Sequence, residues 1–336
     1  YNYADLVKYL VNKGYKKGED LFGIPYDWVL YYPGTADLFK RLKSFIEEQH
    51  SKSGNKVILM GHSMGTHVVR MLLNYTSDEW FKEHIDGIEL LAPAFFGCFV
   101  SFNMVVQGKF GAIPQNEIAA KSARQMPSLH LLWDNYVVFD NHPVFRNVPN
   151  KPEGIKPNEV KDYLVSIGRF DEDAQKIFEF VEPSLQQAPR EPPVRTYILY
   201  NSGISTPISL DASNNFSFIN ESGDGICHDG GPKYACTHWK NAKCFDWKKD
   251  DRDYGHSTMM YRESSLERIY DFIGNDSQPS NKTDYKLVII VGSICGVVII
   301  ASVIATIVVI RKRNNSQPKE ERNTGVLNQK LLESND

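Results

Sequence analysis

The stretch that decides the fold is Val57-Ile-Leu-Met-Gly-His-Ser-Met-Gly65. Residues 57–60 predict a buried strand, because a short apolar run bounded by turn residues is typical of one. The next five residues form a G-x-S-x-G motif, and the apolar residues after it recur at helical spacing. Strand, tight turn and helix are the context in which this motif marks a nucleophilic serine, Ser63. The alternative is an ordinary Gly-Ser turn between a strand and a helix.

The chain has 336 residues and a formal net charge of −3. This length suits one large domain or two small ones with an ample core. No basic stripe or nucleic-acid motif is visible, so nucleic acid is not expected as a partner. The first residues read as mid-domain sequence, and we therefore expect the N-terminal strands of the fold to be missing from this chain.

Strands and helices alternate around the G-x-S-x-G motif. Apolar residues at helical spacing predict helices near residues 3–11 and 38–46, and residues 20–24 and 87–92 read as extended. This alternation predicts an α/β domain with a mostly parallel sheet, extending over residues 1–273.

Residues 95–150, approximately, break the alternation. They mix large apolar side chains with glycine and proline and show no clean periodicity. A long irregular insertion of this kind is typical of a lid or binding loop. Its apolar groups need a partner, which is either a lipid chain or the rest of the core.

The second half of the domain returns to regular patterns. Helices are predicted at 159–167 and 172–181, strands at 195–200 and 216–219, and a closing helix near 260–273. Residues 227–254 read as a loop.

Three residues stand in an order typical of hydrolases with an α/β fold. Ser63 is followed by Asp224, on a loop at a strand end, and then by His256, which gives nucleophile, acid and base. An imidazole is needed to take the serine proton, and a carboxylate would hold the ring tautomer. Spacing alone leaves rivals open for the base and the acid: His62, His67, Asp211 and Asp229.

The chain resembles the lecithin–cholesterol acyltransferase family, which includes the lysosomal phospholipase A/transacylase branch. The matching motifs occur in family order between residue 3 and about residue 273: Pro25-Tyr26-Asp27-Trp28, Gly61-His-Ser-Met-Gly65, Ile85-Asp-Gly87, Ala92-Pro93, Gly223-Asp224-Gly225, and His256 with Met259. The resemblance implies an α/β-hydrolase fold with a lid after Pro93. It also implies Ser63 as nucleophile, Asp224 as acid, His256 as base and the Met64 N–H as an oxyanion donor.

The chain departs from the family at several positions. Ala94-Phe-Phe-Gly-Cys98 replaces the usual tryptophan and small residues, and Ile226-Cys227 replaces the usual Thr-Val. The first departure concerns the shape of the pocket rather than the triad. The family's N-terminal third, which carries the other oxyanion donor, has no counterpart here, so we expect this chain to hold only half of the oxyanion hole.

Five cysteines raise the question of disulfides or metal. Cys295 lies in an apolar segment, and the other four permit three pairings: Cys98, Cys227, Cys236 and Cys244. Together with His228 and His238 some of them could imitate a zinc site, but the spacings fit no standard zinc pattern. We expect disulfides, and neither a metal nor a cofactor.

Residues 287–310 predict a transmembrane helix. They are 24 residues without a charge, and about 20 suffice to cross a bilayer. The basic residues 311–313 follow at once, which places the tail 311–336 in the cytosol and the catalytic domain in a lumen or outside the cell, joined by a polar stalk at 274–286. Sequons on the lumenal side predict a glycoprotein: Asn74, Asn215, Asn220, Asn275 and Asn281.

These features together predict a membrane-anchored serine acyl hydrolase or O-acyltransferase that acts on a glycerophospholipid. Ser63 would form an acyl-enzyme, and water or a lipid alcohol would accept the acyl group. One alternative is a catalytically silent surface glycoprotein or lipid-binding protein of this fold. A peptidase or a triacylglycerol lipase would share the triad, and only the resemblance and the apolar lid speak against it.

Overall fold

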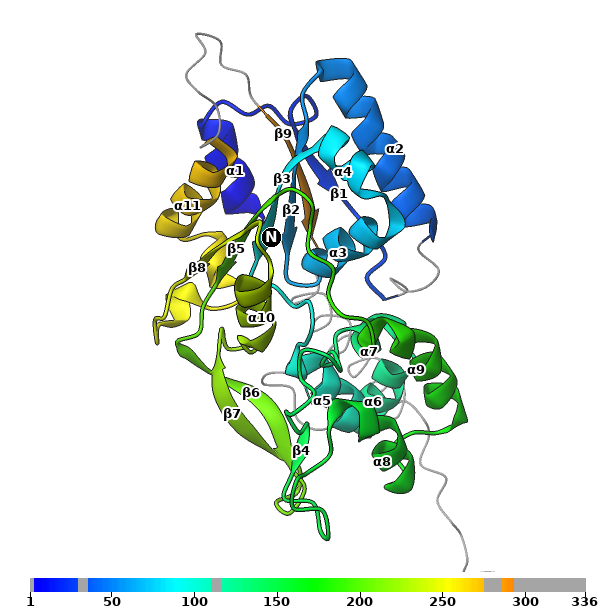
Figure 1. Ribbon diagram of the computed structural model, residues 1–336. Helices are drawn as coiled ribbons and strands as arrows, with labels where there is room; N and C mark the ends of the chain where they lie inside the picture. Colours follow the sequence, from blue (N-terminus) through cyan, green and yellow to red (C-terminus); the bar gives the residue numbers. More distant parts are fainter. Residues whose placement is uncertain (1–2, 30–35, 110–115, 275–285, 293–336) are drawn as a thin grey trace, which may run out of the picture. The chain divides into compact units, whose positions relative to one another are not determined.

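A parallel sheet organises the computed structural model, which describes residues 3–29, 36–109, 116–274 and 286–292 (Figure 1). The strand order is β1-β9-β2-β3-β5-β8, and every neighbouring pair runs parallel. The strands are β1 (Leu21–Ile24), β2 (Val57–His62), β3 (Ile85–Leu91), β5 (Arg195–Tyr200), β8 (Ala242–Asp246) and β9 (Leu287–Gly292). The predicted α/β architecture with a mostly parallel sheet is therefore confirmed.

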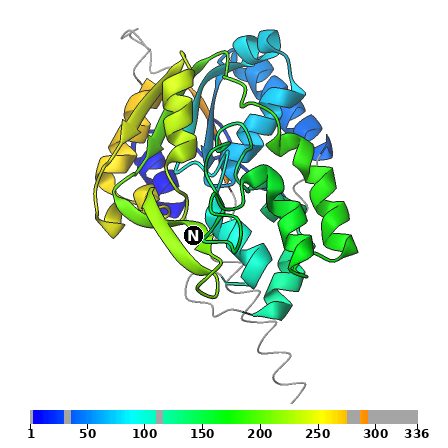
Figure 2. The ribbon, with the colours of Figure 1, turned by 60° about the horizontal axis from the view of Figure 1, so that its bottom comes forward.

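Helices cover both faces of this sheet (Figures 1 and 2). The dark blue α1 (Ala4–Asn12) and the golden α11 (Glu263–Gly274) lie on one face. The other face carries α2 (Ala36–Ser53), α3 (Gly65–Tyr75) and α4 (Asp78–His84). The helices predicted from apolar spacing are thus confirmed.

Strand β2 shows why the sheet needs a layer of helices on each face. Val57 and Leu59 pack into the core formed with α2 and α3, whereas Ile58 and Met60 pack into the core formed with α1 and α11. All six β2 residues are buried. A continuous apolar run is what a strand covered on both faces requires.

The insertion between β3 and β5 is helical rather than irregular, and it continues beyond residue 150. It contains α5 (Phe99–Gln107), α6 (Glu117–Arg124), α7 (Pro127–Leu131), η1 (Pro157–Glu159), α8 (Val160–Ser166) and α9 (Glu172–Leu185). The side chains of α5 are almost all buried, including Ser101, Asn103 and Gln107. A helix that is covered on all sides has no amphipathic period. The core of the protein is thus the partner of these apolar groups in this structure.

Residues 227–254 are also more regular than the predicted loop. They contain α10 (Gly230–His238), strand β8 and the short η2 (Arg252–Tyr254), and η3 (Thr258–Met260) follows. Helix α10 begins with Gly-Gly-Pro, and the residues of β8 are mostly half-buried, so neither carries a strong pattern. A small second sheet joins β4 (Phe145–Arg146), β6 (Ile204–Asp211) and β7 (Ser217–Gly223).

Strand β9 corrects the predicted transmembrane helix at its beginning. Residues Leu287–Gly292 are extended and lie between β1 and β2, with Ile289 opposite Phe22 and Leu59. A short run of leucine, valine and isoleucine satisfies a buried parallel strand as well as a membrane helix, because both surround it with apolar groups. Residues 293–310 lie outside the described part of the chain. Among the described residues, no helix has the length and apolar character needed to cross a membrane.

Candidate active site

Ser63 lies in a sharp turn between β2 and α3. Its φ of 53° falls in the left-handed region, which non-glycine residues rarely occupy outside strained functional turns. A Cβ on Gly61 would lie 2.8 Å from the carbonyl oxygen of Gly65, so this position has no room for a side chain. The Ser63 N–H donates to the carbonyl of Leu91 at the end of β3, at 3.0 Å. This geometry leaves the Ser63 side chain only partly buried.

The structure brings Ser63, His256 and Asp224 together. The Ser63 hydroxyl lies 2.7 Å from Nε2 of His256, and Nδ1 of His256 lies 2.8 Å from Oδ2 of Asp224. Since a carboxylate only accepts, Nδ1 carries the ring proton and Nε2 accepts from the serine. His256 and Asp224 are 7% and 5% exposed, so the chain of hydrogen bonds is shielded from water behind the serine.

The loop after β7 holds the Asp224 carboxylate by its backbone. The N–H groups of Ile226 and Cys227 donate to Oδ1 at 3.0 and 2.8 Å, which leaves Oδ2 for His256. The backbone N–H of His256 donates to the Asp224 carbonyl at 3.0 Å. Asp224 and His256 are therefore joined by a backbone hydrogen bond as well as by a side-chain hydrogen bond.

His62 contacts the backbone of His256, the candidate base. Its Nε2 lies 2.9 Å from the carbonyl oxygen of His256 and must donate, because a carbonyl only accepts. Burial, and then the nearby His256, lower the pKa of His62 to about 3, so the ring is neutral. Its Nδ1 is then an acceptor, and the Tyr3 hydroxyl lies 3.4 Å from it.

The other rivals for acid and base lie in separate environments. Nε2 of His67 contacts the carbonyl of Ala94, and burial lowers the pKa of His67 to about 3. Asp211 is bound in a turn by Ser213 and by Asn147. Asp229 contacts the Ser222 hydroxyl and Lys233.

Met64, the predicted oxyanion donor, directly follows Ser63 at the start of α3, where backbone N–H groups favour a negative oxygen. Its side chain is buried in a small apolar cluster, here called the Met64 cluster, which extends to the acid loop. The members of the Met64 cluster are Met64, Ala94, Cys98, Leu132 and Cys227, with Tyr26, Trp28, Val100 and Ile226 packed against them.

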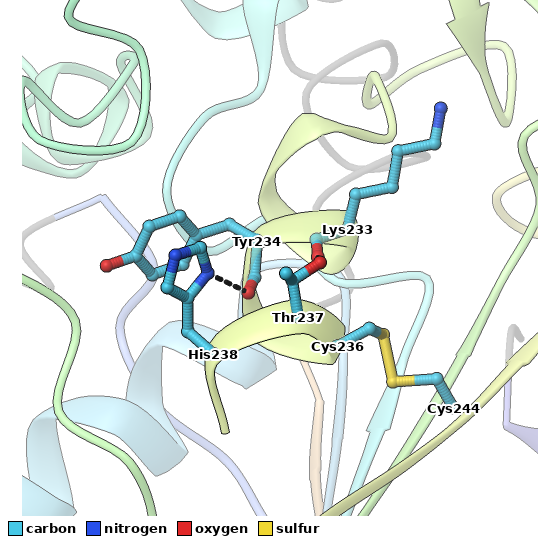
Figure 3. Close-up of a disulfide and its surroundings, with 6 residues drawn as sticks. All are labelled: Lys233, Tyr234, Cys236, Thr237, His238 and Cys244. Carbon is cyan, nitrogen blue, oxygen red and sulfur yellow. Dashed lines mark hydrogen bonds between the residues drawn. A yellow bond between two sulfur atoms is a disulfide. The ribbon is translucent and has the colours of Figure 1, made fainter. Parts of the chain in front are cut away.

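Two of the cysteines that could have imitated a zinc site form a disulfide. Cys236 on α10 and Cys244 on β8 are joined, and the His238 ring beside them stacks on Tyr234 and contacts its carbonyl (Figure 3). Their sulfurs are therefore not available as metal ligands. No group of three or more potential metal-ligating side chains occurs within the part of the chain that is described.

Two supporting contacts were not predicted from the sequence. The Cys227 N–H that holds Asp224 makes an Asx-type turn, which an aspartate at a strand end could have suggested. The His62 contact to His256 has no such local signal, because the two residues are 194 positions apart.

Comparison with known proteins gives related sequences. Residues 1–134 match the family described as Lecithin:cholesterol acyltransferase. The lysosomal phospholipase A and acyltransferase of Bos taurus is 26% identical over 213 residues, which cover 61% of this chain and 50% of that protein. The phosphatidylcholine-sterol acyltransferase of Mus musculus is 28% identical over 283 residues, which cover 79% of this chain and 61% of that protein.

The chain thus spans between half and about three fifths of the length of these two relatives. Among solved structures, the crystal structure of the Tle4-Tli4 complex matches with a TM-score of 0.42 and 13% identity, covering 69% of this chain and 62% of that one. The sequence comparisons confirm the resemblance that the motifs predicted.

Proposed function

We propose that this chain, which resembles the lecithin–cholesterol acyltransferase family, is a serine acyl hydrolase and O-acyltransferase with an α/β-hydrolase fold. The observation that carries the proposal is the hydrogen-bonded chain from Ser63 through His256 to Asp224. Three residues from separate parts of the sequence meet in the geometry that acyl transfer needs.

In the first half of the reaction, the Ser63 hydroxyl attacks an ester carbonyl. His256 accepts the proton at Nε2 and becomes an imidazolium, which the Asp224 carboxylate stabilises across the 2.8 Å contact at Nδ1. The negative charge on the carbonyl oxygen develops next to the start of α3, where the Met64 N–H would donate to it.

The first half ends when the leaving group departs. His256 protonates the departing alcohol, and the acyl group stays on Ser63 as an ester. In the second half, water or a lipid alcohol gives its proton to His256 and attacks the acyl carbonyl, and His256 passes that proton to the Ser63 oxygen as the acyl–serine bond breaks. Hydrolysis and transfer therefore use the same residues and differ only in the second substrate.

The substrate proposed is a glycerophospholipid. The name of one relative contains phospholipase A, and the name of the other contains phosphatidylcholine. Met64, the residue after Ser63, belongs to a buried apolar cluster, and apolar groups next to the nucleophile agree with a lipid substrate. The acyl acceptor is water or a lipid alcohol.

A catalytically silent member of the fold is the alternative. Such a protein has no need for the strained Ser63 turn or for two backbone donors that fix Asp224. A displaced His256 would have favoured it, whereas His256 lies within hydrogen-bond distance of both partners.

We also propose that the chain is a type I membrane glycoprotein with a lumenal or extracellular catalytic domain. With Leu287–Gly292 used in β9, residues 293–310 remain as 18 uncharged residues before the basic cluster. This length lies at the lower end of the range of ~17–25 residues for a membrane helix.

Incubation with acyl-labelled phosphatidylcholine, with and without a sterol or a ceramide, tests the function. We expect labelled fatty acid without an acceptor and a labelled acyl ester with one. Ser63→Ala should abolish both products and labelling by a fluorophosphonate probe, whereas Ser166→Ala, at an exposed serine of α8, should retain both. A wild-type protein that neither turns over phosphatidylcholine nor reacts with the probe would contradict the proposal.

A further inference from the structure

Two cysteines that the mechanism does not use lie in direct contact. The Sγ atoms of Cys98 and Cys227 are 2.6 Å apart, and the two residues are 6% and 2% exposed. A disulfide bond is about 2.05 Å long, so a small shift of either side chain would join them. Both are free cysteines here, in contrast to Cys236 and Cys244 (Figure 3).

The pair connects the acid loop to the start of the helical insertion. Cys98 immediately precedes α5, and its N–H donates to the carbonyl of Leu132 at 2.7 Å. Cys227 donates its N–H to the Asp224 carboxylate and accepts the Asp224 N–H at its own carbonyl, at 3.1 Å. The position of the Cys227 backbone therefore determines the position of the carboxylate.

We propose that Cys98 and Cys227 form a second disulfide, which fixes the loop of the catalytic acid to the segment that begins α5. The two thiols lose two protons and two electrons, and a disulfide oxidant of the secretory pathway is reduced to two thiols in exchange. The proposal rests on the lumenal or extracellular location given above, because that compartment maintains disulfides.

The surroundings of Cys227 determine when this bond forms. Burial first, and then the adjacent Cys98 thiol, raise the pKa of Cys227 well above its ordinary value. Thiol–disulfide exchange requires a thiolate, and burial disfavours that form of Cys227 in the folded protein. We therefore expect oxidation while the loop is still open during folding, and the burial of both sulfurs should slow the attack of an external reductant on the folded protein.

The two disulfides constrain the chain to different extents. Cys98 and Cys227 are 129 positions apart, whereas Cys236 and Cys244 are 8 apart. In the chain-entropy account, a longer closed loop removes more conformational freedom from the unfolded state. Loss of the first bond should thus lower the melting temperature more than loss of the second.

Peptide mapping of the full chain, purified from a eukaryotic secretory pathway, tests the bond without reference to activity. The unfolded protein is treated with N-ethylmaleimide without reductant, freed of N-glycans and digested with trypsin. We expect peptide 83–109 linked to 196–233, and 234–240 linked to 244–248. N-ethylmaleimide on Cys98 and Cys227, or a link from either to another cysteine, would overturn the proposal.

Reactivity of Ser63 tests the role in positioning. In Cys98→Ala/Cys227→Ala, labelling by a fluorophosphonate should slow by between ~10-fold and ~10²-fold, since small misplacements of catalytic groups have such effects. The pH profile of labelling should also shift, because His256 loses its fixed carboxylate.

The matched control is Cys236→Ala/Cys244→Ala, which should keep the wild-type rate and pH profile. The positioning role would be refuted if the wild type contains the Cys98–Cys227 link but the pH profile of the Cys98→Ala/Cys227→Ala variant is unchanged.

Discussion

In the proposed mechanism, the position of the proton on His256 decides whether Ser63 can react. The Asp224 carboxylate keeps that proton on Nδ1, so Nε2 faces the serine as an acceptor. Asp224→Asn can donate its amide N–H to Nδ1 and thus favours the other tautomer. We expect kcat to fall on the order of 10⁴-fold, with little change in melting temperature, in hydrolysis of a soluble ester.

Asp229→Asn is the control for this variant. Asp229 is also buried but contacts Ser222 and Lys233 rather than His256. Its activity should stay within tenfold of the wild type, roughly, because the triad is untouched. Full activity in Asp224→Asn would refute the assignment of the acid.

His62 is expected to act on the position of His256. His62→Leu removes the side-chain N–H that donates to the His256 carbonyl, whereas His62→Gln offers an amide N–H instead. An unsatisfied buried acceptor costs about 1–3 kcal/mol, so the free energy of unfolding should fall by this amount in the leucine variant. Its kcat should fall as well, and the glutamine variant should recover part of both. Equal loss in the two variants would show that the hydrogen bond has no such role.

Glu89 makes the stability of the domain depend on pH. Its carboxyl lies in β3 at 0% exposure, and neither oxygen has a hydrogen-bond partner among the described residues. Burial raises its pKa well above the ordinary value, against an opposing effect of Arg195. The folded state therefore binds a proton that the unfolded state releases. Its stabilising contribution is complete below the ordinary pKa near 4.5 and is lost as pH rises toward the folded-state pKa.

Urea unfolding at a series of pH values above 4.5 measures this effect. We expect Glu89→Gln to remove part of the decline in stability with rising pH, because an amide does not titrate. Glu153→Gln, at an exposed position, should leave the decline as it is. An identical pH dependence in wild type and Glu89→Gln would mean that Glu89 ionises without cost.

At the residue scale, the sequence indicated the candidate nucleophile more specifically than the candidate acid and base. The G-x-S-x-G context singles out Ser63 as the candidate nucleophile from nine consecutive residues. Asp224 and His256 had equal rivals until the family motifs were considered, because the contacts that select them join distant parts of the chain. The His62–His256 contact was missed for the same reason.

At the scale of elements, periodicity predicted those helices that have one solvent-exposed face. Helices α8 and α9 begin within one residue of the predicted positions. Helix α5 was missed, because its polar residues are buried together with its apolar ones. Strand β8 was missed since its residues are neither strongly apolar nor alternating.

The pairing of strand β9 with β2 can be tested by cross-linking. Leu59 and Ile289 are register partners, and both side chains contribute to the core on the side of α2 and α3. We expect Leu59→Cys/Ile289→Cys to form a disulfide under mild oxidation of the detergent-solubilised protein. Leu59→Cys/Val288→Cys should not, because successive side chains of a strand point to opposite faces. If both pairs fail to cross-link, residues 287–292 do not form this strand, and a membrane helix beginning at residue 287 becomes the better interpretation.

At the scale of the whole molecule, the sequence predicted the fold class but not the order of the strands. Alternating elements predict a parallel sheet, whereas the position of β9 between β1 and β2 depends on pairing with residues more than 200 positions away. Any of several apolar runs in this chain could have taken that central position. Local patterns do not distinguish them, because each satisfies the same requirement for burial on two faces.

The proposed topology can be tested through the sequons. Asn74, Asn215 and Asn220 are exposed in the structure, so each can carry a glycan without disturbing the core. We expect Asn74→Gln, Asn215→Gln and Asn220→Gln each to lower the mass of the secretory-pathway protein by one glycan. Asn314→Gln is the control and should change nothing, because its sequon follows the basic cluster on the cytosolic side.

Protease added outside sealed vesicles of native orientation gives an independent measurement of the same topology. It should remove the tail 311–336 and leave the catalytic domain intact, because only the tail would face the cytosol. Retention of the glycans through this digestion would place the exposed sequons and the tail on opposite sides of one bilayer. A glycan on Asn314, or a tail that is protected until detergent is added, would require the opposite orientation or a chain that does not span the membrane. Ser63 would then meet its lipid substrate from a different compartment.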